Sequence, residues 1–352
     1  MNRRAILEEA ILPPFVALLL AAVVGDVLIL SFGQSPGDVY KLLLDGTWGN
    51  AYGFGQVLYK ATTLVFTGLA VGLGLRAGLF NIGAESQLAA GGFCAALAGM
   101  LLPAGIPALV CLPLFIFAAG LGGGVVGAIP GVLKARFGAH EVIVTIMLNF
   151  IVLALLNYLT SEKFHVPDTL HTPELKSGPL PRLGDMMDSF HGSAANATIL
   201  LAIIAAIVMG WYLFRTRRGF ELRAVGLQSH AAEYAGVNVA GVTWRALAVS
   251  GAIAGLGGLN YVLGYKHYYE EGFATGAGFL GIAVALVGRN HPVGIILAAL
   301  LFATLSQGGL AVNAIVPKQM VDVLQAVVIL AVSTSVPEVR RLLRGARRSV
   351  ES

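Results

Sequence analysis

The sequence predicts an all-α fold, a polytopic helical bundle of the inner-membrane type with about 8–10 transmembrane helices. Of its 352 residues, 57% are hydrophobic and only 12% are charged. A soluble domain is about 25% charged, so most of this chain is solvated by lipid. Apolar runs such as Ile199–Met209 do not alternate with polar residues. The strands of an outer-membrane barrel would alternate, so the runs are interpreted as helices.

Ten apolar segments follow one another along the chain. They lie at about 11–31, 57–75, 79–102, 106–130, 141–160, 196–214, 244–264, 273–289, 292–314 and 319–336. Arg3 and Arg4 before the first segment resemble the start of a signal peptide, but Glu8 and Glu9 interrupt the basic region. The first apolar run is long enough to span, so we expect an uncleaved first span.

Glycine, with 45 residues in the chain, marks where the segments are expected to break or to pack closely. Only Arg76–Gly78 separates the second segment from the third, so a broken or re-entrant helix is expected near 79–102. The short, glycine-rich segment 273–289 has the same ambiguity. Cys94 and Cys111 lie in apolar segments and are expected to be buried thiols with no disulfide.

The charges of the loops predict the orientation, because cytoplasmic loops carry an excess of lysine and arginine. The loop 215–243 and the tail 337–352 are rich in arginine and should be cytoplasmic. The segment 161–195 has three basic and five acidic residues, a net charge of 3 − 5 = −2, and should be external. Its four prolines disfavour a long helix, and it is either a connector or a contact for an external partner. We expect one transmembrane domain over 1–352, with both termini cytoplasmic.

A polar group begins the third segment: Asn81, Glu85 and Gln87. A charged residue at the centre of a bilayer helix costs about 2.5–3.5 kcal/mol, and such residues usually face a bundle interior or a water-filled route. They are therefore candidates to line a transport path. The alternative is structural: Glu85 pairs with Arg76 or caps a broken helix.

The fifth segment repeats the pattern, with Glu141, Asn149 and Asn157 spaced eight apart and so near one face of a helix. Asn149 joins the path candidates, although interhelical hydrogen bonding explains it equally well. Glu141 is expected at the start of its helix, where an acid favours the helix dipole.

The loop 215–243 contains the pattern of a short helix. Ser229 is placed to cap a helix over His230–Ala235, which would end at Gly236. A short helix across the cytoplasmic face suits a transporter that receives force from a motor subunit. An ordinary amphipathic loop at the interface is the alternative.

Several classes of site are missing from the sequence. The chain has no Gly-Lys dipeptide and hence no P-loop, no Gly-x-Ser-x-Gly elbow and no His-Glu-x-x-His. Its seven histidines show no metal-ligand spacing, and His291 before Pro292 is interpreted as a turn residue. We therefore expect neither an enzyme, nor a metal site, nor a nucleic-acid partner.

The run Gly78-Leu-Phe-Asn-Ile-Gly-Ala-Glu85 with Gln87 resembles a motif of ABC-transporter permeases of the branched-chain amino acid and simple-sugar group. Within that group it is most similar to nucleoside permeases. Three later stretches match in order, at 141–149, 222–236 and 281–292. The chain departs from the family at Ser86, where glycine is usual, which puts fine substrate choice in doubt.

The resemblance implies an importer in a bacterial cytoplasmic membrane. This chain would pair with a second, identical or different permease subunit, with an ATP-binding subunit that alone binds ATP, and with an extracytoplasmic substrate-binding protein. The substrate would be a small molecule, most simply a nucleoside. The stretch that would contact the ATPase comprises Arg223, Gly226, His230, Ala231, Ala232, Glu233 and Gly236.

Two alternatives to a nucleoside importer remain open from the sequence. One is the same machine carrying a simple sugar or another small polar solute. The other is an ion-coupled carrier that acts without an ATPase. We also expect that Glu85→Ala impairs uptake without loss of the folded protein.

Overall fold

The computed structural model describes residues 12–273, 276–313, 315–317 and 319–331, and their regular structure is helical. Each of the ten predicted apolar segments contains a helix, which confirms the predicted fold class. These helices are α2 (Leu12–Ser31), α4 (Ala51–Arg76), α5 (Ala84–Met100), α6 (Ala108–Phe137), α7 (Glu141–Glu162), α9 (Thr198–Arg215), α12 (Val239–Leu256), α14 (Ala277–Val287), α15 (Pro292–Val312) and a last helix, Gln319–Ala331. Arg3, Arg4 and the tail 337–352 lie outside the described residues.

Shorter helices lie between the spans, and the apolar pattern did not predict most of them. They are α3 (Pro36–Asp45), α8 (Leu183–Met186), η2 (Asp188–Phe190), α10 (Arg217–Leu227), α11 (Ser229–Tyr234) and α13 (Leu259–Val262). The predicted short helix at 230–235 corresponds to α11. In the described residues, six helices are long and apolar enough to cross a membrane, so the chain is a multi-pass membrane protein.

Some predicted helix ends were wrong by several residues. The segment predicted over 106–130 continues through Pro130 to Phe137, and Lys134 and Arg136 occupy its last turn. Cations favour the negative end of the helix dipole there, and Gly138 ends the helix in the left-handed conformation, with φ +68°. Helix α4 begins at Ala51, several residues before the apolar run that predicted it.

The contacts divide the chain into two compact units. The described part of the first comprises 12–54 and residues from Thr304 onward. Its apolar core joins α2, α3 and the residues from the end of α15 onward through Ile29, Val39 and Val312, among others. The second unit is Gly55–Ala303 and contains every candidate site residue. The boundaries fall within α4 and α15.

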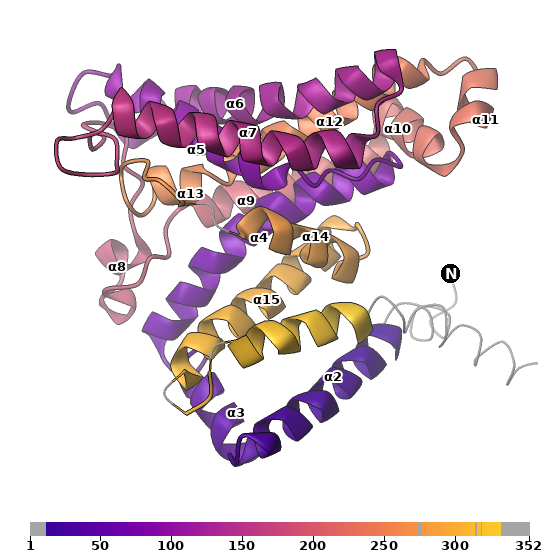
Figure 1. The fold of residues 1–352 in the computed structure, drawn as a ribbon. Helices are drawn as coiled ribbons and strands as arrows, with labels where there is room; N and C mark the ends of the chain where they lie inside the picture. Colours follow the sequence, from indigo (N-terminus) through magenta and orange to yellow (C-terminus); the bar gives the residue numbers. More distant parts are fainter. Residues whose placement is uncertain (1–11, 274–275, 314, 318, 332–352) are drawn as a thin grey trace, which may run out of the picture. The chain divides into compact units, whose positions relative to one another are not determined.

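Helices α5, α6 and α12 pack closely against one another in the second unit (Figure 1). Glycines allow their backbones to meet: a Cβ atom at Gly123 of α6 would overlap the Gly251 carbonyl of α12, and one at Gly91 of α5 would overlap Gly255. Helices in lipid associate through such small residues because apolar burial gives no advantage there. Most residues of α5 are buried and the others are half-buried, so this helix is enclosed by protein.

Interruptions in three apolar segments create the polar interior of the second unit. The segment predicted to break near 79–102 begins its helix only at Ala84, because residues 77–83 form a turn. Helix α12 ends at Leu256 and is followed by the single turn α13. Helix α14 has 11 residues. At about 1.5 Å per residue it is roughly half as long as a bilayer core is thick.

The segment 163–197 lies at the end of the second unit opposite α10 and α11, as the position of α8 shows (Figure 1). It contains no long helix, as its prolines predicted. Backbone hydrogen bonds tie it to the segment after α13: Thr172 N–H donates to the Tyr269 carbonyl at 2.8 Å, and Leu175 N–H to that of His267 at 2.7 Å. The segment is therefore held in place by hydrogen bonds to residues 267–269.

Candidate functional site

Asn81 is the centre of a buried hydrogen-bond network. Its Nδ2 donates to Gln87 Oε1 at 2.8 Å and to Ser250 Oγ on α12 at 2.7 Å, while its Oδ1 accepts from Gln87 Nε2 at 3.1 Å. The Ser250 hydroxyl in turn donates to the Ala70 carbonyl of α4 at 2.6 Å. Asn81, Gln87 and Ser250 are all fully buried. The network therefore fastens the turn 77–83 to α4, α5 and α12.

Glu85 caps the beginning of α14. Its Oε1 accepts from Gly276 N–H and its Oε2 from Gly278 N–H, both at 2.6 Å. Gly278 must be glycine for this approach, because a Cβ atom there would overlap the Glu85 backbone. Both carboxyl oxygens therefore accept a hydrogen bond from a backbone N–H group, in a position where Glu85 is only 3% exposed. The N-terminus of a helix is a site that favours negative charge.

Asn149 of α7 performs the same task for α5. Its Oδ1 accepts from Ser86 N–H at 3.2 Å, and its Nδ2 donates to the Ile82 carbonyl at 3.0 Å. The interhelical hydrogen bonding that the sequence offered as an alternative is therefore present. Ser86 fits its buried position because its hydroxyl donates to the Gly83 carbonyl at 3.0 Å. Asn157 is half-buried further along α7.

The four path candidates thus meet at one place, which we call the polar hub: Asn81, Glu85, Gln87 and Asn149. The hub lies where two short helices, α5 and α14, both begin. Among the ion pairs of the described residues, none joins Glu85 to Arg76. Arg76 instead donates from Nε to the Asn290 carbonyl at 2.9 Å, in the turn before α15. The hub side chains bond protein groups, so the hub sets the geometry of the bundle interior.

The second predicted group lies on α10 and α11. Arg223 and Gly226 belong to α10, and Gly236 ends the region in the left-handed conformation, with φ +82°. Ala232 is buried, whereas three neighbours on α11 are exposed: His230, Ala231 and Glu233. The prediction that Ser229 caps α11 was wrong. Gln228, with φ −158°, occupies the N-cap position, so the helix starts one residue earlier.

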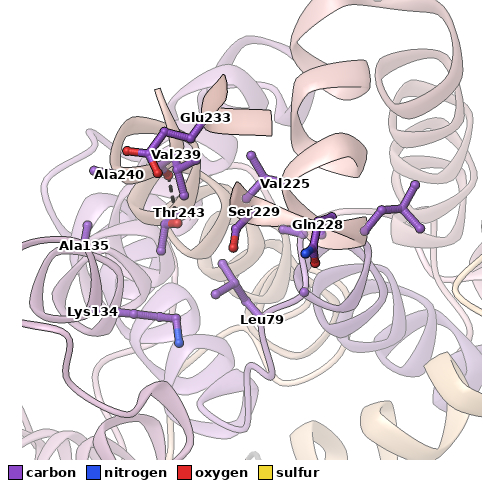
Figure 2. A pocket seen from close by; sticks show the side chains of 14 residues that line it. Leu79, Lys134, Ala135, Val225, Gln228, Ser229, Glu233, Val239, Ala240 and Thr243 are labelled. Atoms are coloured by element: carbon purple, nitrogen blue, oxygen red, sulfur yellow. Dashed lines mark hydrogen bonds between the residues drawn. The ribbon is translucent and has the colours of Figure 1, made fainter. Parts of the chain in front are cut away.

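A cavity of about 560 Å³ lies beside α10 and α11 (Figure 2). Its walls come from the turn 77–79, the end of α6, and the region from α10 to the start of α12. Lys134, at its edge, pairs with Glu141 at 2.6 Å. Glu141 is the first residue of α7, as predicted. Gly226 and Glu233 line the cavity, and the hub residues do not.

Several residues of these two groups could not be identified from the sequence. Ser250, Gly276 and Gly278 complete the hub but lie far from it in the chain. Leu227 and Tyr234 are 87% and 95% exposed at the α11 end. The turn assigned to His291 is confirmed, since Arg289 and Asn290 both have positive φ. Among the described residues, no group of His, Cys, Asp and Glu side chains could hold a metal ion.

Comparisons with known proteins identify the family to which this chain belongs. Residues 53–333 match the family described as branched-chain amino acid transport system / permease component. The guanosine ABC transporter permease protein NupP of Bacillus subtilis is 39% identical over 92% of this chain and 93% of that protein.

Two further relatives are similar over most of their lengths. The nucleoside ABC transporter permease protein NupB of Lactococcus lactis is 34% identical over 91% of this chain and 89% of that protein. The glucose ABC transporter permease protein TsgB13 of Haloferax volcanii is 35% identical over 92% and 87%. No solved structure matches the chain significantly. With most of its length matched, the chain belongs to the permease family of the branched-chain amino acid transport system.

Proposed function

We propose that this chain is the permease subunit of an ATP-driven importer of nucleosides. The observation that carries the proposal is the similarity to NupP, which covers nearly the whole of both chains. The polar hub supports it, since the enclosed helix α5 and the half-length helix α14 resemble the broken helices found at the centre of other transporters. A glucose importer is the second candidate, because TsgB13 is almost as similar.

The proposed importer needs partners. Bacillus subtilis has a second guanosine permease, NupQ, which is also similar to this chain. We therefore propose a pair of unlike permease subunits, each meeting an ATP-binding subunit. ATP binds to that subunit, and an extracytoplasmic substrate-binding protein delivers the cargo. Exposed Leu227 and Tyr234 support an ATPase contact at α10 and α11.

The proposed orientation places α10 and α11 in the cytoplasm of a bacterial cell, with the segment 161–195 outside. The arginines of α10 and its flanks support it. Labelling of a cysteine at Ser229 or at Asp185 in intact cells tests it. A membrane-impermeant maleimide should label the cysteine at Asp185 and leave the one at Ser229 unlabelled. The reverse pattern would overturn the orientation.

Uptake of labelled guanosine, adenosine and uridine tests the proposed cargo. The host should lack its own nucleoside importers and express this chain with its second permease and binding protein, with or without the ATPase. ATPase-dependent nucleoside uptake is the expected result. ATPase-dependent glucose uptake would move the cargo to sugars. Uptake driven by an ion gradient without the ATPase would overturn the proposal.

A further inference from the structure

The end of α10 touches the beginning of the turn 77–83 directly through the backbone. A Cβ atom at Gly226 would overlap the Arg76 carbonyl oxygen and would lie 2.8 Å from both Ala77 C and Gly78 N. In the other direction, a Cβ atom at Gly78 would lie 3.1 Å from the Gly226 Cα atom. Real Cβ atoms do not approach so closely, so this contact needs glycine at position 226 and leaves no free space between the two backbones.

A side-chain cluster reinforces the same contact. The guanidinium carbon of Arg223, on α10, lies 5.4 Å from the centre of the Phe214 ring. That of Arg76, at the end of α4, lies 5.9 Å from the same ring. A cation over an aromatic face is attracted to the ring, and more strongly when the pair is desolvated. The Phe214 ring therefore interacts both with α10 and with Arg76, the residue directly before the turn 77–83.

The turn passes the contact on to the polar hub. Gly78 is three residues before Asn81, and Leu79 N–H is bonded to the Gly74 carbonyl at 2.9 Å. Asn81 and Leu79 are buried, so the turn is held by its surroundings. We therefore expect a displacement of residues 76–78 to move Asn81 and Glu85 as well.

Space for such a displacement exists beside the contact, in a cavity whose walls include both α10 and residues 77–79 of the turn. The 560 Å³ cavity borders Gly226, Gln228 and Ser229 (Figure 2). Packed elements can move relative to one another only where a void or a second packing is available. The contact at Gly226 is thus tight toward the turn, and α11 has room beside it.

We infer that the backbone contact of Gly226 with residues 76–78 is the joint through which a movement of α10 and α11 shifts the polar hub. Gly226 acts as a positioning residue, since it would act on the transport path only through the turn 77–83. The inference rests on the proposed function, in which a partner that binds ATP moves α10 and α11. It adds the position at which that movement enters the permease.

The test uses the assembled transporter, with all its subunits, in lipid nanodiscs and in proteoliposomes. Gly226→Ala is compared with Gly120→Ala, whose added Cβ meets no atom within 4 Å in the same unit. We expect Gly226→Ala to lower the number of nucleosides transported per ATP hydrolysed at least tenfold, with ATP hydrolysis retained. Gly120→Ala should leave this ratio unchanged. An unchanged ratio in Gly226→Ala would overturn the inference.

Hydrogen exchange gives a readout that does not depend on the cargo, and its wild-type measurement does not depend on the folding of the variant. In the wild-type complex, ATP should change the exchange of peptides covering both 217–236 and 76–87. In Gly226→Ala it should change only the first. A response at 217–236 without one at 76–87 in the wild type would overturn the joint and leave the proposed function standing. Lack of any response at 217–236 would overturn both, whereas lack of nucleoside uptake alone would overturn only the cargo.

Discussion

Replacing Glu85 by glutamine should destabilise the folded protein measurably. Glutamine keeps one acceptor oxygen, but its NH₂ group would face the second backbone N–H, so one of the two 2.6 Å hydrogen bonds is lost. A hydrogen bond to a charged group contributes about 1.5–3 kcal/mol. The lost attraction between the charge and the α14 N-terminus adds about 0.3–2 kcal/mol. The substitution should therefore cost about 2–5 kcal/mol.

The assay is thermal unfolding of the purified protein in detergent at a fixed scan rate, because membrane proteins often unfold irreversibly. At about 2 °C per kcal/mol for a large chain, the apparent Tm should fall by about 4–10 °C. Glu162→Gln, at an exposed position ending α7, is the matched control and should change Tm by no more than about 1 °C. An unchanged Tm in Glu85→Gln together with lost uptake would refute the reasoning, because the carboxylate would then act on the cargo.

Three further changes probe the packing and the pH dependence of the fold. Ser86→Gly should lower Tm slightly, since it removes a buried hydrogen bond worth about 0.5–1.5 kcal/mol; an equal or higher Tm would show that the hydroxyl is dispensable. Gly123→Ala should cost at least about 1–3 kcal/mol by forcing α6 from α12, whereas Gly120→Ala should be neutral or stabilising; equal melting temperatures would contradict the packing. Burial and, to a smaller extent, the nearby Arg182 cation lower the pKa of His267 in the folded protein. As the pH falls below about 6.5, this histidine therefore binds a proton in the unfolded chain before it does so in the folded one, and the free energy of unfolding decreases. The Tm of the wild type should therefore fall more between pH 7.5 and 5.5 than that of His267→Asn, a replacement that tolerates the positive φ of this position; parallel curves would exclude His267 as the cause.

The helices of the bundle could be predicted from the sequence because each one is recorded locally. Twenty apolar residues in a row specify a span wherever they occur. Helix α10 could not be predicted in this way because it is polar. It is stabilised by packing and by its N-cap residue Thr216, whose hydroxyl accepts a hydrogen bond from Gly219 N–H. The interruption before Ala84 could also be predicted from neighbouring residues, since Gly78 and Gly83 favour a break in the helix there.

The role of the hub could not be predicted, because the partners are distant in the chain. The sequence identified Asn81 and Glu85 as costly at membrane depth but left their task open. Ser250, which accepts a hydrogen bond from Asn81, lies 169 residues further along the chain. Gly276, which donates one to Glu85, lies 191 residues further along. No periodicity or spacing links positions so far apart. The same limit applies to Gly226, whose contact with residues 76–78 depends on tertiary structure alone.

The distance in the chain between the hub and its partners also sets a schedule for biogenesis. Asn81 and Glu85 leave the ribosome long before α12 and α14 exist. At about 5–20 residues per second, the 191 residues between Glu85 and Gly276 take roughly 10–40 s to synthesise. During that interval an unpartnered carboxylate begins a helix that must enter lipid. We therefore expect α5 to need shelter from lipid until α12 and α14 have been synthesised.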